Sequence, residues 1–427
     1  MMSKLLLQGG RIIDKAGDRY ADVLIDSDGR IEQIGEGLEA NKILDVRGKI
    51  ISSGFVDLNA FIGEPGEEQS ETFISGTRSA VKGGYTAIMT VPDSHVVNDN
   101  PNTAKALIEL SKQGLCEVIT AGESTLTGNR AAMSPLGEMS DLGVKFFTIT
   151  GSPSTDLETT RRIMEYSQKY GIKLLFGSSK GLLSQDGVMN EGAVSSQLGI
   201  LGIPKVAEQI EVFQLCQLAL LTGADLHFQQ ISTSRSIQII AEAKLEGASV
   251  TCEISPHHFS LDESLVRSFN ARYKVFPPLR NSEEIELIKQ QITSVDAIAT
   301  GHRPHPDHLK DQAFADAPFG TIGFETSLGA AITNLQIPIS EILDLLSWTP
   351  AEIAGIADTH GGNLLAGRPA NLTVFDPDAA WTVEGKKMSS ACSVTAFENM
   401  ELKGLVSHTL VDGKLVVMDG TIQDIGK

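Results

Sequence analysis

The chain of 427 residues is long enough for one large domain with a smaller accessory domain, and its apolar fraction of 41% is that of an ordinary globular protein. The formal charge of −19 argues against nucleic acid or an anionic membrane as partner, because both bind basic surfaces. We find no signal-peptide pattern and no run of about twenty apolar residues, so we expect a cytoplasmic protein. The four cysteines show no metal-binding spacing and are expected to be reduced, buried thiols.

The two ends of the chain share a pattern of short strands and tight turns. The first end shows alternating or apolar segments at 4–8, 22–26 and 30–34, and the last end at 371–375, 381–383, 405–411 and 414–417. Asp28-Gly29 and Asp412-Gly413 are hairpin signals. We therefore predict one small β domain built from both ends of the chain.

Between these ends, strand-like and helix-like segments alternate as in successive βα units. The predicted strands are 55–58, 86–90, 117–121, 144–148, 172–176, 225–230, 249–253 and 296–300. Amphipathic helices are predicted at 206–221 and 236–245, ending before Gly223 and Gly247. Eight strands predict an α/β fold of the TIM (β/α)8 barrel type, in which functional side chains lie at the C-terminal ends of the strands. The predicted division is 1–50 and 349–427 for the β domain and 51–348 for the barrel.

One stretch at the end of the first predicted barrel strand allows a more specific interpretation. Residues 54–66 read GFVDLNAFIGEPG, and Glu67, Glu71-Thr72 and the segment 83–86 follow. This frame resembles the start of a dihydroorotase, the cyclic amidohydrolase of pyrimidine biosynthesis. The resemblance continues through EISPHHF at 253–259 and through 361–376, so it covers nearly the whole chain. It implies an amidohydrolase-type barrel with a small β-sandwich domain made from both chain ends.

The residues that the resemblance assigns to the metal and to catalysis are different in this chain. The family's first strand ends in His-x-His, which suits a divalent ion, whereas this chain has Asn59 and Phe61. An amide is a poor ligand for a transition metal, and a phenyl ring has no lone pair. The six vacated positions, where the family has metal ligands or the catalytic Asp, are Asn59, Phe61, Thr150, Phe176, Gln230 and Gly301.

The family's substrate-binding positions have changed as well. Gly63 stands where the family has an Arg, and Asp93 and Phe276 stand where it has Asn. A carboxylate substrate would therefore lose an Arg and meet Asp93. The aromatic residues Phe61, Phe176 and Phe276 suggest that their side chains fill the substrate pocket that the family resemblance implies. From these changes we predict no catalytic residues, no substrate-binding residues and no cofactor, with zinc in particular expected to be absent.

The rate contributions of the metal and of the remaining side chains favour loss of activity if the chain binds no metal. A catalytic zinc lowers the pKa of its water from about 15.7 to about 7, whereas general acid–base catalysis contributes only about 10²–10⁴ in rate. His302, His305 and His308, with Asp307, are the best remaining metal candidate, but descent from the family's Asp-His-Ala-Pro-His explains the first two. Whether these three histidines bind a metal is left open.

The other histidines have simpler explanations. His227, His257 and His258 lie in or just after predicted strands, where a local hydrogen-bonding or packing role is expected.

Three functions remain from the sequence. The first, which the resemblance favours, is a non-catalytic subunit that forms a hetero-oligomer with aspartate transcarbamoylase. The second is an active cyclic amidohydrolase that cleaves a cyclic amide C–N bond with a relocated or absent metal. The third is a ligand-sensing barrel that uses Arg280, Arg303 and His305 for an anion. The sequence leaves the stoichiometry, the contact surface and self-association open.

Overall fold

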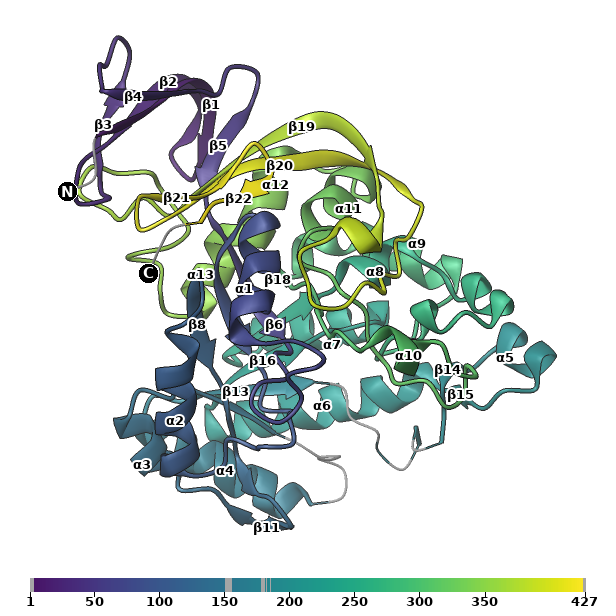
Figure 1. Cartoon of the computed structure of the whole chain (residues 1–427). Helices are drawn as coiled ribbons and strands as arrows, with labels where there is room; N and C mark the ends of the chain where they lie inside the picture. Colours follow the sequence, from purple (N-terminus) through teal and green to yellow (C-terminus); the bar gives the residue numbers. More distant parts are fainter. Residues whose placement is uncertain (1–3, 150–155, 178–180, 182, 185, 425–427) are drawn as a thin grey trace.

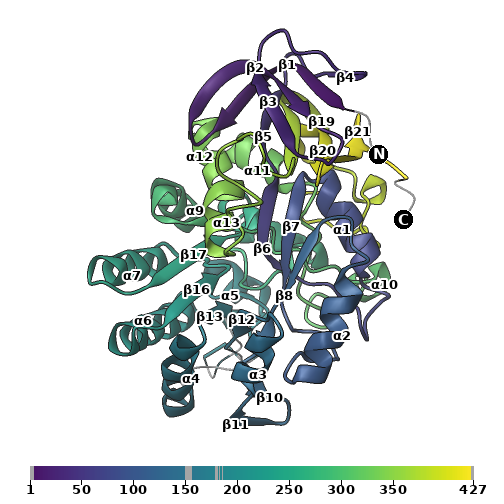
Figure 2. The same cartoon turned by 90° about the vertical axis from the view of Figure 1, so that its left-hand side faces the viewer.

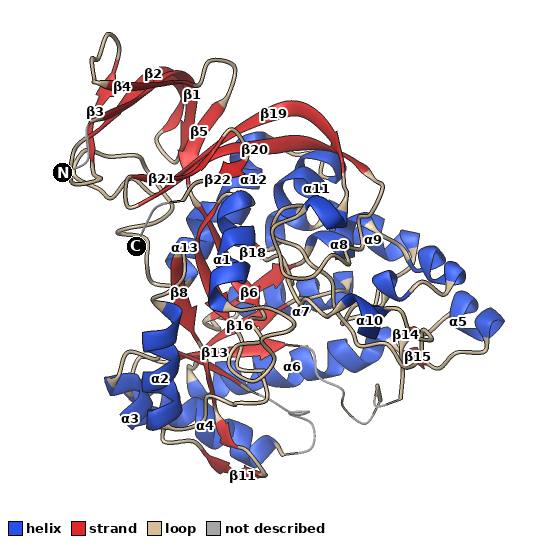
Figure 3. Cartoon of the chain, viewed as in Figure 1, coloured by secondary structure: helices blue, strands red, loops and turns tan. Residues whose placement is uncertain are grey.

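The computed structural model describes residues 4–149, 156–177, 181, 183, 184 and 186–424. Within these ranges eight strand positions form a parallel barrel, which confirms the predicted fold class (Figure 3). Its strands are β6 (Phe55–Ala60), β7 (Tyr85–Thr90), β8 (Glu117–Thr120) continued by β9 (Gly122–Glu123), β12 (Phe146–Thr148), β13 (Lys173–Gly177), β16 (Asp225–Gln229), β17 (Val250–Ile254) and β18 (Ala297–Ile298). A parallel bridge between Ala60 and His302 closes the ring, so the eight predicted strands meet at one mouth.

Helices surround the barrel (Figures 1 and 2). The longer ones are α1 (Phe73–Lys82), α2 (Pro101–Ser111), α4 (Leu157–Lys169), α6 (Lys205–Thr222), α7 (Ser234–Leu245), α9 (Ser282–Gln290) and α11 (Ser327–Asn334). The shorter ones are α3 (Leu136–Asp141), α5 (Ala193–Leu198), α8 (Pro256–Ser260), α10 (Asp307–Lys310), α12 (Ile339–Leu343) and α13 (Thr349–Ile353). The side chain of Thr233 caps α7, and Gly223 ends α6 in the left-handed region at φ 75°, as residues of these types do.

Both ends of the chain enter one sheet beside the barrel (Figure 1). Its strands are β1 (Leu5–Asp14), β2 (Gly17–Ile25), β3 (Ile31–Gly35), β4 (Lys42–Asp45), β5 (Ile50–Ser53), β19 (Leu372–Thr382), β20 (Glu401–Val411), β21 (Lys414–Met418) and β22 (Thr421–Ile422). The antiparallel pairing of β5 with β19 joins the first part of the chain to the last. The β-rich domain from both ends is thus confirmed, while the exact domain limits stay a prediction.

The barrel interior is closed at the end opposite the mouth. Val56, Leu58, Met89 and Leu175 point into it and pack against Ala351 of α13. Strands buried on both faces, such as β6 and β7, explain the continuous apolar runs in the sequence. All four cysteines are buried and unpaired, as predicted. Over the described ranges, no helix combines the length and apolarity needed to cross a bilayer.

Candidate functional site

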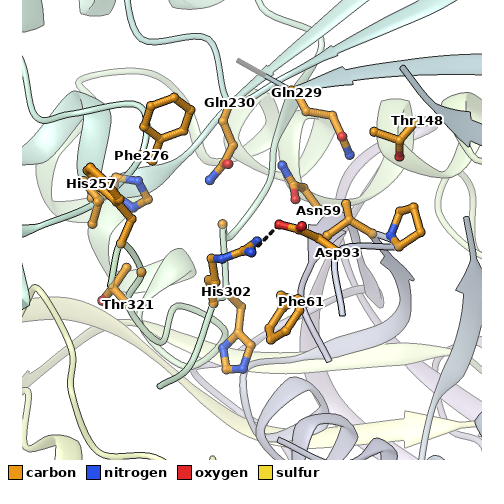
Figure 4. Close-up of a pocket in the computed structure, with 18 of the residues that line it drawn as sticks. Asn59, Phe61, Asp93, Thr148, Gln229, Gln230, His257, Phe276, His302 and Thr321 are labelled. Carbon is orange, nitrogen blue, oxygen red and sulfur yellow. Dashed lines mark hydrogen bonds and ion pairs between the residues drawn. The ribbon is translucent and has the colours of Figure 1, made fainter. Parts of the chain in front are cut away.

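A cavity of about 450 Å³ opens at the C-terminal ends of the barrel strands (Figure 4). This size suits a small organic molecule, and the place is where TIM-barrel enzymes bind substrates. The lining residues come from the ends of β6, β7, β12, β13, β16 and the loops after β17 and β18. They include Asn59, Phe61, Asp93, Arg130, Thr148, Gln229, Gln230, His257, Phe276, Gly301, His302, Arg303 and Thr321.

The structure brings four of the six vacated positions together in this cavity: Asn59, Phe61, Gln230 and Gly301. Thr150, the fifth, lies outside the described residues. Phe176 lies instead in the hydrophobic core, 1% exposed, with its ring edge-to-face against Phe228 at 6.0 Å between centroids.

Of the three positions at which the family binds substrate, two line the cavity and one does not. Asp93 and Phe276 line the cavity, and Gly63 does not. Phe276 packs against Phe319 along the wall, with ring centroids 5.4 Å apart. The expectation that Phe61, Phe176 and Phe276 fill the implied substrate pocket is wrong, because Phe176 packs into the core and the other two leave the cavity open.

Gln230 occupies the space that a side chain at residue 301 would need. A Cβ added at Gly301 would overlap Gln230 Nε2 and would lie 2.7 Å from Ser255 Oγ. Gln230 itself has a left-handed backbone, with φ 52°, and its Nε2 donates a 3.2 Å hydrogen bond to Ser255 Oγ. The Gln230 amide therefore lies beside Gly301, the position at which the family resemblance has the catalytic Asp.

Below the cavity floor lies a buried chain of polar groups. Asn59 Nδ2 donates to Glu253 Oε1 at 2.9 Å, and Glu253 Oε2 lies 3.0 Å from His227 Nε2. His227 Nδ1 lies 2.8 Å from Thr251 Oγ1. Burial raises the pKa of Glu253 to about 8 and lowers that of His227 to about 3, because each loses its hydration when charged. Both groups are therefore neutral at pH 7, with the Glu253 carboxyl donating to His227.

The polar lining of the cavity is dominated by neutral amides. Gln229 Nε2 donates to Leu58 O at 2.9 Å, and the amide nitrogens of Asn59 and Gln230 are held by Glu253 and Ser255. Each bond uses one of the two N–H donors of its amide, so the carbonyl oxygen and the second N–H of the same group remain for a ligand. These three oxygens can accept hydrogen bonds from N–H groups.

Two further polar atoms at the cavity are buried and have no hydrogen-bond partner among the described residues. They are His257 Nε2 and Thr148 Oγ1. Burial lowers the pKa of His257 well below its usual value, which leaves the ring neutral at pH 7. A ligand in the cavity would supply the partner that buried polar atoms normally have.

Charged groups lie at the rim. Arg303 forms an ion pair with Asp93, drawn as a dashed line in Figure 4, and its guanidinium lies 4.6 Å from the centre of the Phe61 ring. Arg130 of β11 (Asn129–Met133) is exposed to solvent.

The anion-binding set suggested for a sensor is not formed. Arg280 is buried beside Asn190 and Ser232, with Nη1 2.9 Å from Asn190 Oδ1 and Nε 3.1 Å from Ser232 Oγ. His305 donates from Nε2 to Phe319 O at 2.8 Å. That part of the sensor hypothesis is wrong, because Arg280 and His305 are bound to protein groups and Arg303 is paired with Asp93.

The remaining histidines bind separate partners. His302 Nδ1 accepts from the Gly323 amide at 3.2 Å, and His258 lies with Nε2 2.8 Å from Pro277 O. The local hydrogen-bonding role expected for His227 and His258 is confirmed, whereas His257 faces the cavity. Across the described residues, no three or more His, Cys, Asp or Glu side chains come together as a metal site.

Comparison with known proteins identifies relatives over the whole chain. No family model matches. A dihydroorotase from Geobacter metallireducens is 35% identical over 423 residues, covering 96% of this chain and 99% of that protein. A dihydroorotase from Citrifermentans bemidjiense is 36% identical over 423 residues, with the same coverage.

Solved structures share the fold. A D-hydantoinase matches with a TM-score of 0.86 at 20% identity, covering 98% of this chain and 96% of that one. An L-hydantoinase (dihydropyrimidinase) from Arthrobacter aurescens matches with a TM-score of 0.86 at 21% identity, covering 99% and 98%.

These relatives correct two predictions. The hypothesis that the chain is not an enzyme is wrong on this comparison, because curated relatives 33–36% identical over nearly the full length carry an enzyme's name. The prediction of no cofactor is wrong for the same reason, because membership of a metal-dependent hydrolase family makes a metal the expected cofactor.

The described residues at the family's metal positions do not fit that ion. Asn59 supplies an amide, Phe61 and Phe176 supply phenyl rings, and Gly301 has no side chain. The chemistry that follows from this cavity is therefore that of its amides, its imidazole and its rim charges. The chain is 35–36% identical to dihydroorotases over 96% of its length, although its site is altered. It therefore belongs to the dihydroorotase-like amidohydrolase family.

Proposed function

We propose that this chain binds a cyclic amide of pyrimidine metabolism in the cavity at the barrel mouth and hydrolyses a C–N bond of its ring. The observation that carries the proposal is the row of oriented amide groups, Asn59, Gln229 and Gln230, on the cavity wall. Their carbonyl oxygens complement the ring N–H groups of a cyclic amide. The similarity to dihydroorotases over almost the full length supports the same chemical class.

His257 is the residue best placed to move a proton in this reaction. Hydrolysis needs a base that takes a proton from the attacking water and returns it to the leaving nitrogen. The His257 ring lines the cavity, is neutral at pH 7 and has an unpartnered Nε2 among the described residues. General acid–base catalysis of this kind contributes about 10²–10⁴ in rate, and its lowered pKa makes His257 a weak base, so we expect slow turnover without a metal-activated water.

The test is ring opening by the purified chain, with metal content measured on the same preparation. Dihydrouracil, hydantoin and dihydroorotate are incubated with the protein, and ring-opened products are separated by chromatography. We expect turnover of at least one ring, and its loss in His257→Ala. His308→Ala is the control, because His308 is exposed and does not line the cavity. Failure of the wild-type chain both to bind and to open all three rings contradicts the proposal.

We further propose that the chain associates with aspartate transcarbamoylase, the partner that the family resemblance implies. One observation favours a protein contact: Val206, Ile210, Phe213 and Leu221 of α6 share one helix face and are 38–64% exposed. Val206, Ile210 and Phe213 follow one another on this face, and exposed Gln217 separates them from Leu221. Monomeric proteins seldom expose several large apolar side chains side by side. Interfaces bury such residues at their centres.

Light scattering after size exclusion tests this association. This chain and the aspartate transcarbamoylase of the same organism are run alone and mixed at micromolar concentrations. We expect a new discrete species with the wild type and its loss with Phe213→Asp. Tyr20→Asp, at another exposed site, is the control. Two unchanged peaks remove this partner, and a larger species formed by the chain alone assigns the α6 face to self-association.

A further inference from the structure

The charges around the cavity bear on which cyclic amide it takes. A ring of this class occurs either uncharged or with an attached carboxylate, and the two forms make opposite demands on the site. A carboxylate has only acceptor lone pairs and a negative charge, so it needs donors and a cation. An uncharged ring offers N–H donors and carbonyl acceptors, so it needs both kinds of polar group and no charge.

The wall of the cavity favours the uncharged form. The amides of Asn59, Gln229 and Gln230 each bond a protein acceptor with one N–H, and they offer a ligand their carbonyl oxygens and remaining N–H groups without any charge. Neutral acceptors and donors of this kind match the N–H and C=O groups of an uncharged ring, and they supply no cation for a carboxylate. His257 Nε2 and Thr148 Oγ1, which lack partners among the described residues, can serve the ring's carbonyl oxygens or its remaining N–H.

The rim favours the same form. The guanidinium of Arg303 is paired with Asp93 and lies over the Phe61 ring, so its positive charge is already matched. A ligand carboxylate at this place would have to displace Asp93 and would meet its negative charge. Arg130, the other cation among the described lining residues, is exposed, and solvent screens its attraction.

We propose that the cavity selects an uncharged cyclic amide over its carboxylated counterpart, and that Asp93 makes the selection by neutralising Arg303 and repelling a ligand carboxylate. This inference rests on the proposed function, since it names the substrate class for the same cavity. The proposed substrate differs from the one in the name of the curated relatives, because dihydroorotate carries a carboxylate.

Dihydrouracil and dihydroorotate form a matched pair of probes, because they differ by one carboxylate. Titration calorimetry measures both on the wild-type chain. We expect dihydrouracil to bind at least about tenfold more tightly, as follows from one unfavourable charge contact at a partly solvated site. Equal affinities, or tighter binding of dihydroorotate, overturn the inference and leave the proposed function standing. Absence of binding by both rings overturns both.

Variants assign the selection to Asp93. Asp93→Asn frees Arg303, and we expect the ratio of the two dissociation constants to shift about tenfold in favour of dihydroorotate. The double variant Asp93→Asn with Arg303→Gln should lose that shift. Asp141→Asn, an exposed carboxylate at the end of α3, controls for the change in net charge and should leave both affinities as they are. An unchanged preference in Asp93→Asn overturns the role of Asp93.

Discussion

Asn59 Nδ2 donates a 2.9 Å hydrogen bond to Glu253 Oε1 and thereby joins the first barrel strand to the seventh. Because Glu253 is buried and holds its proton to about pH 8, this link is made to a neutral carboxyl. In an unfolded chain the same carboxyl ionises near pH 4.5, so folding stability is lost as the pH rises from 4.5 toward 8.

Glu253→Gln should remove this loss, since the amide keeps both hydrogen bonds and does not titrate. We expect the stability difference between wild type and variant to change by at most about 1.4 kcal/mol per pH unit across this window, with the variant favoured at high pH. Urea unfolding at pH 5, 6, 7 and 8 measures it. Glu109→Gln, a 63% exposed site, is the control. If the unfolding free energies of Glu253→Gln and wild type change in parallel with pH, the prediction is contradicted.

Gly301→Ala tests the crowding by Gln230. The new Cβ displaces the Gln230 amide from its hydrogen bond with Ser255 and also sits on a backbone with φ +59°, so we expect a loss of about 2–3 kcal/mol in unfolding free energy. Gly171→Ala is a close control, because its φ is +60° and nothing lies within 4 Å of the added Cβ. It should cost only about 1–2 kcal/mol. Equal losses at the two glycines would show that Gln230 does not fill the space.

Phe176→Ala tests the position of this ring in the core. The side chain is 1% exposed and packs on Phe228, so its removal should lower the unfolding free energy by about 3–5 kcal/mol. Phe269→Ala, at a site 49% exposed, should change it by less than about 1 kcal/mol. Denaturant titration of both variants decides the matter, and a small effect at Phe176 would place the ring outside the packed interior.

Lys310 holds one wall of the cavity. Its buried Nζ donates to Lys274 O, Pro318 O and Gly320 O at 3.2, 2.9 and 2.8 Å. Lys310→Met leaves these carbonyl oxygens without their donor, so we expect a loss of about 2–4 kcal/mol in stability and weaker ligand binding. Lys105→Met, on the exposed face of α2, is the control. Thermal unfolding measures the loss of stability, and calorimetry with dihydrouracil measures the affinity. Normal affinity in a destabilised Lys310→Met would show that this wall does not contribute to ligand binding.

The sequence predicts the barrel well because its strands are buried on both faces and read as apolar runs. Element limits are less accurate where backbone irregularities intervene. The segment 4–8 is only the start of β1, which continues to Asp14 because a register shift between Leu7 and Gly10 carries the strand past Gly9. The segments 371–375 and 381–383 belong largely to the single strand β19, which contains a second irregularity between Asp376 and Ala380.

The site is predictable in part for a similar reason. Strand ends of a parallel barrel meet at one mouth, so Asn59, Gln230 and Gly301 are expected to lie together, and they do. The pairing of Arg303 with Asp93, 210 positions apart, depends on side-chain directions that spacing does not give. Arg280 has the residue type of an anion ligand, and only its three-dimensional surroundings show that it serves the core.

The pairing of β5 with β19 also has a consequence for the order of synthesis. Because β19 begins at Leu372, a ribosome has made most of the chain before the partner of β5 exists. Nascent domains fold as their residues emerge, so the barrel can close while one edge of the terminal sheet stays open. Open sheet edges promote aggregation. Products of stalled or truncated translation that end before residue 372 should therefore be the forms of this protein that depend most on chaperones.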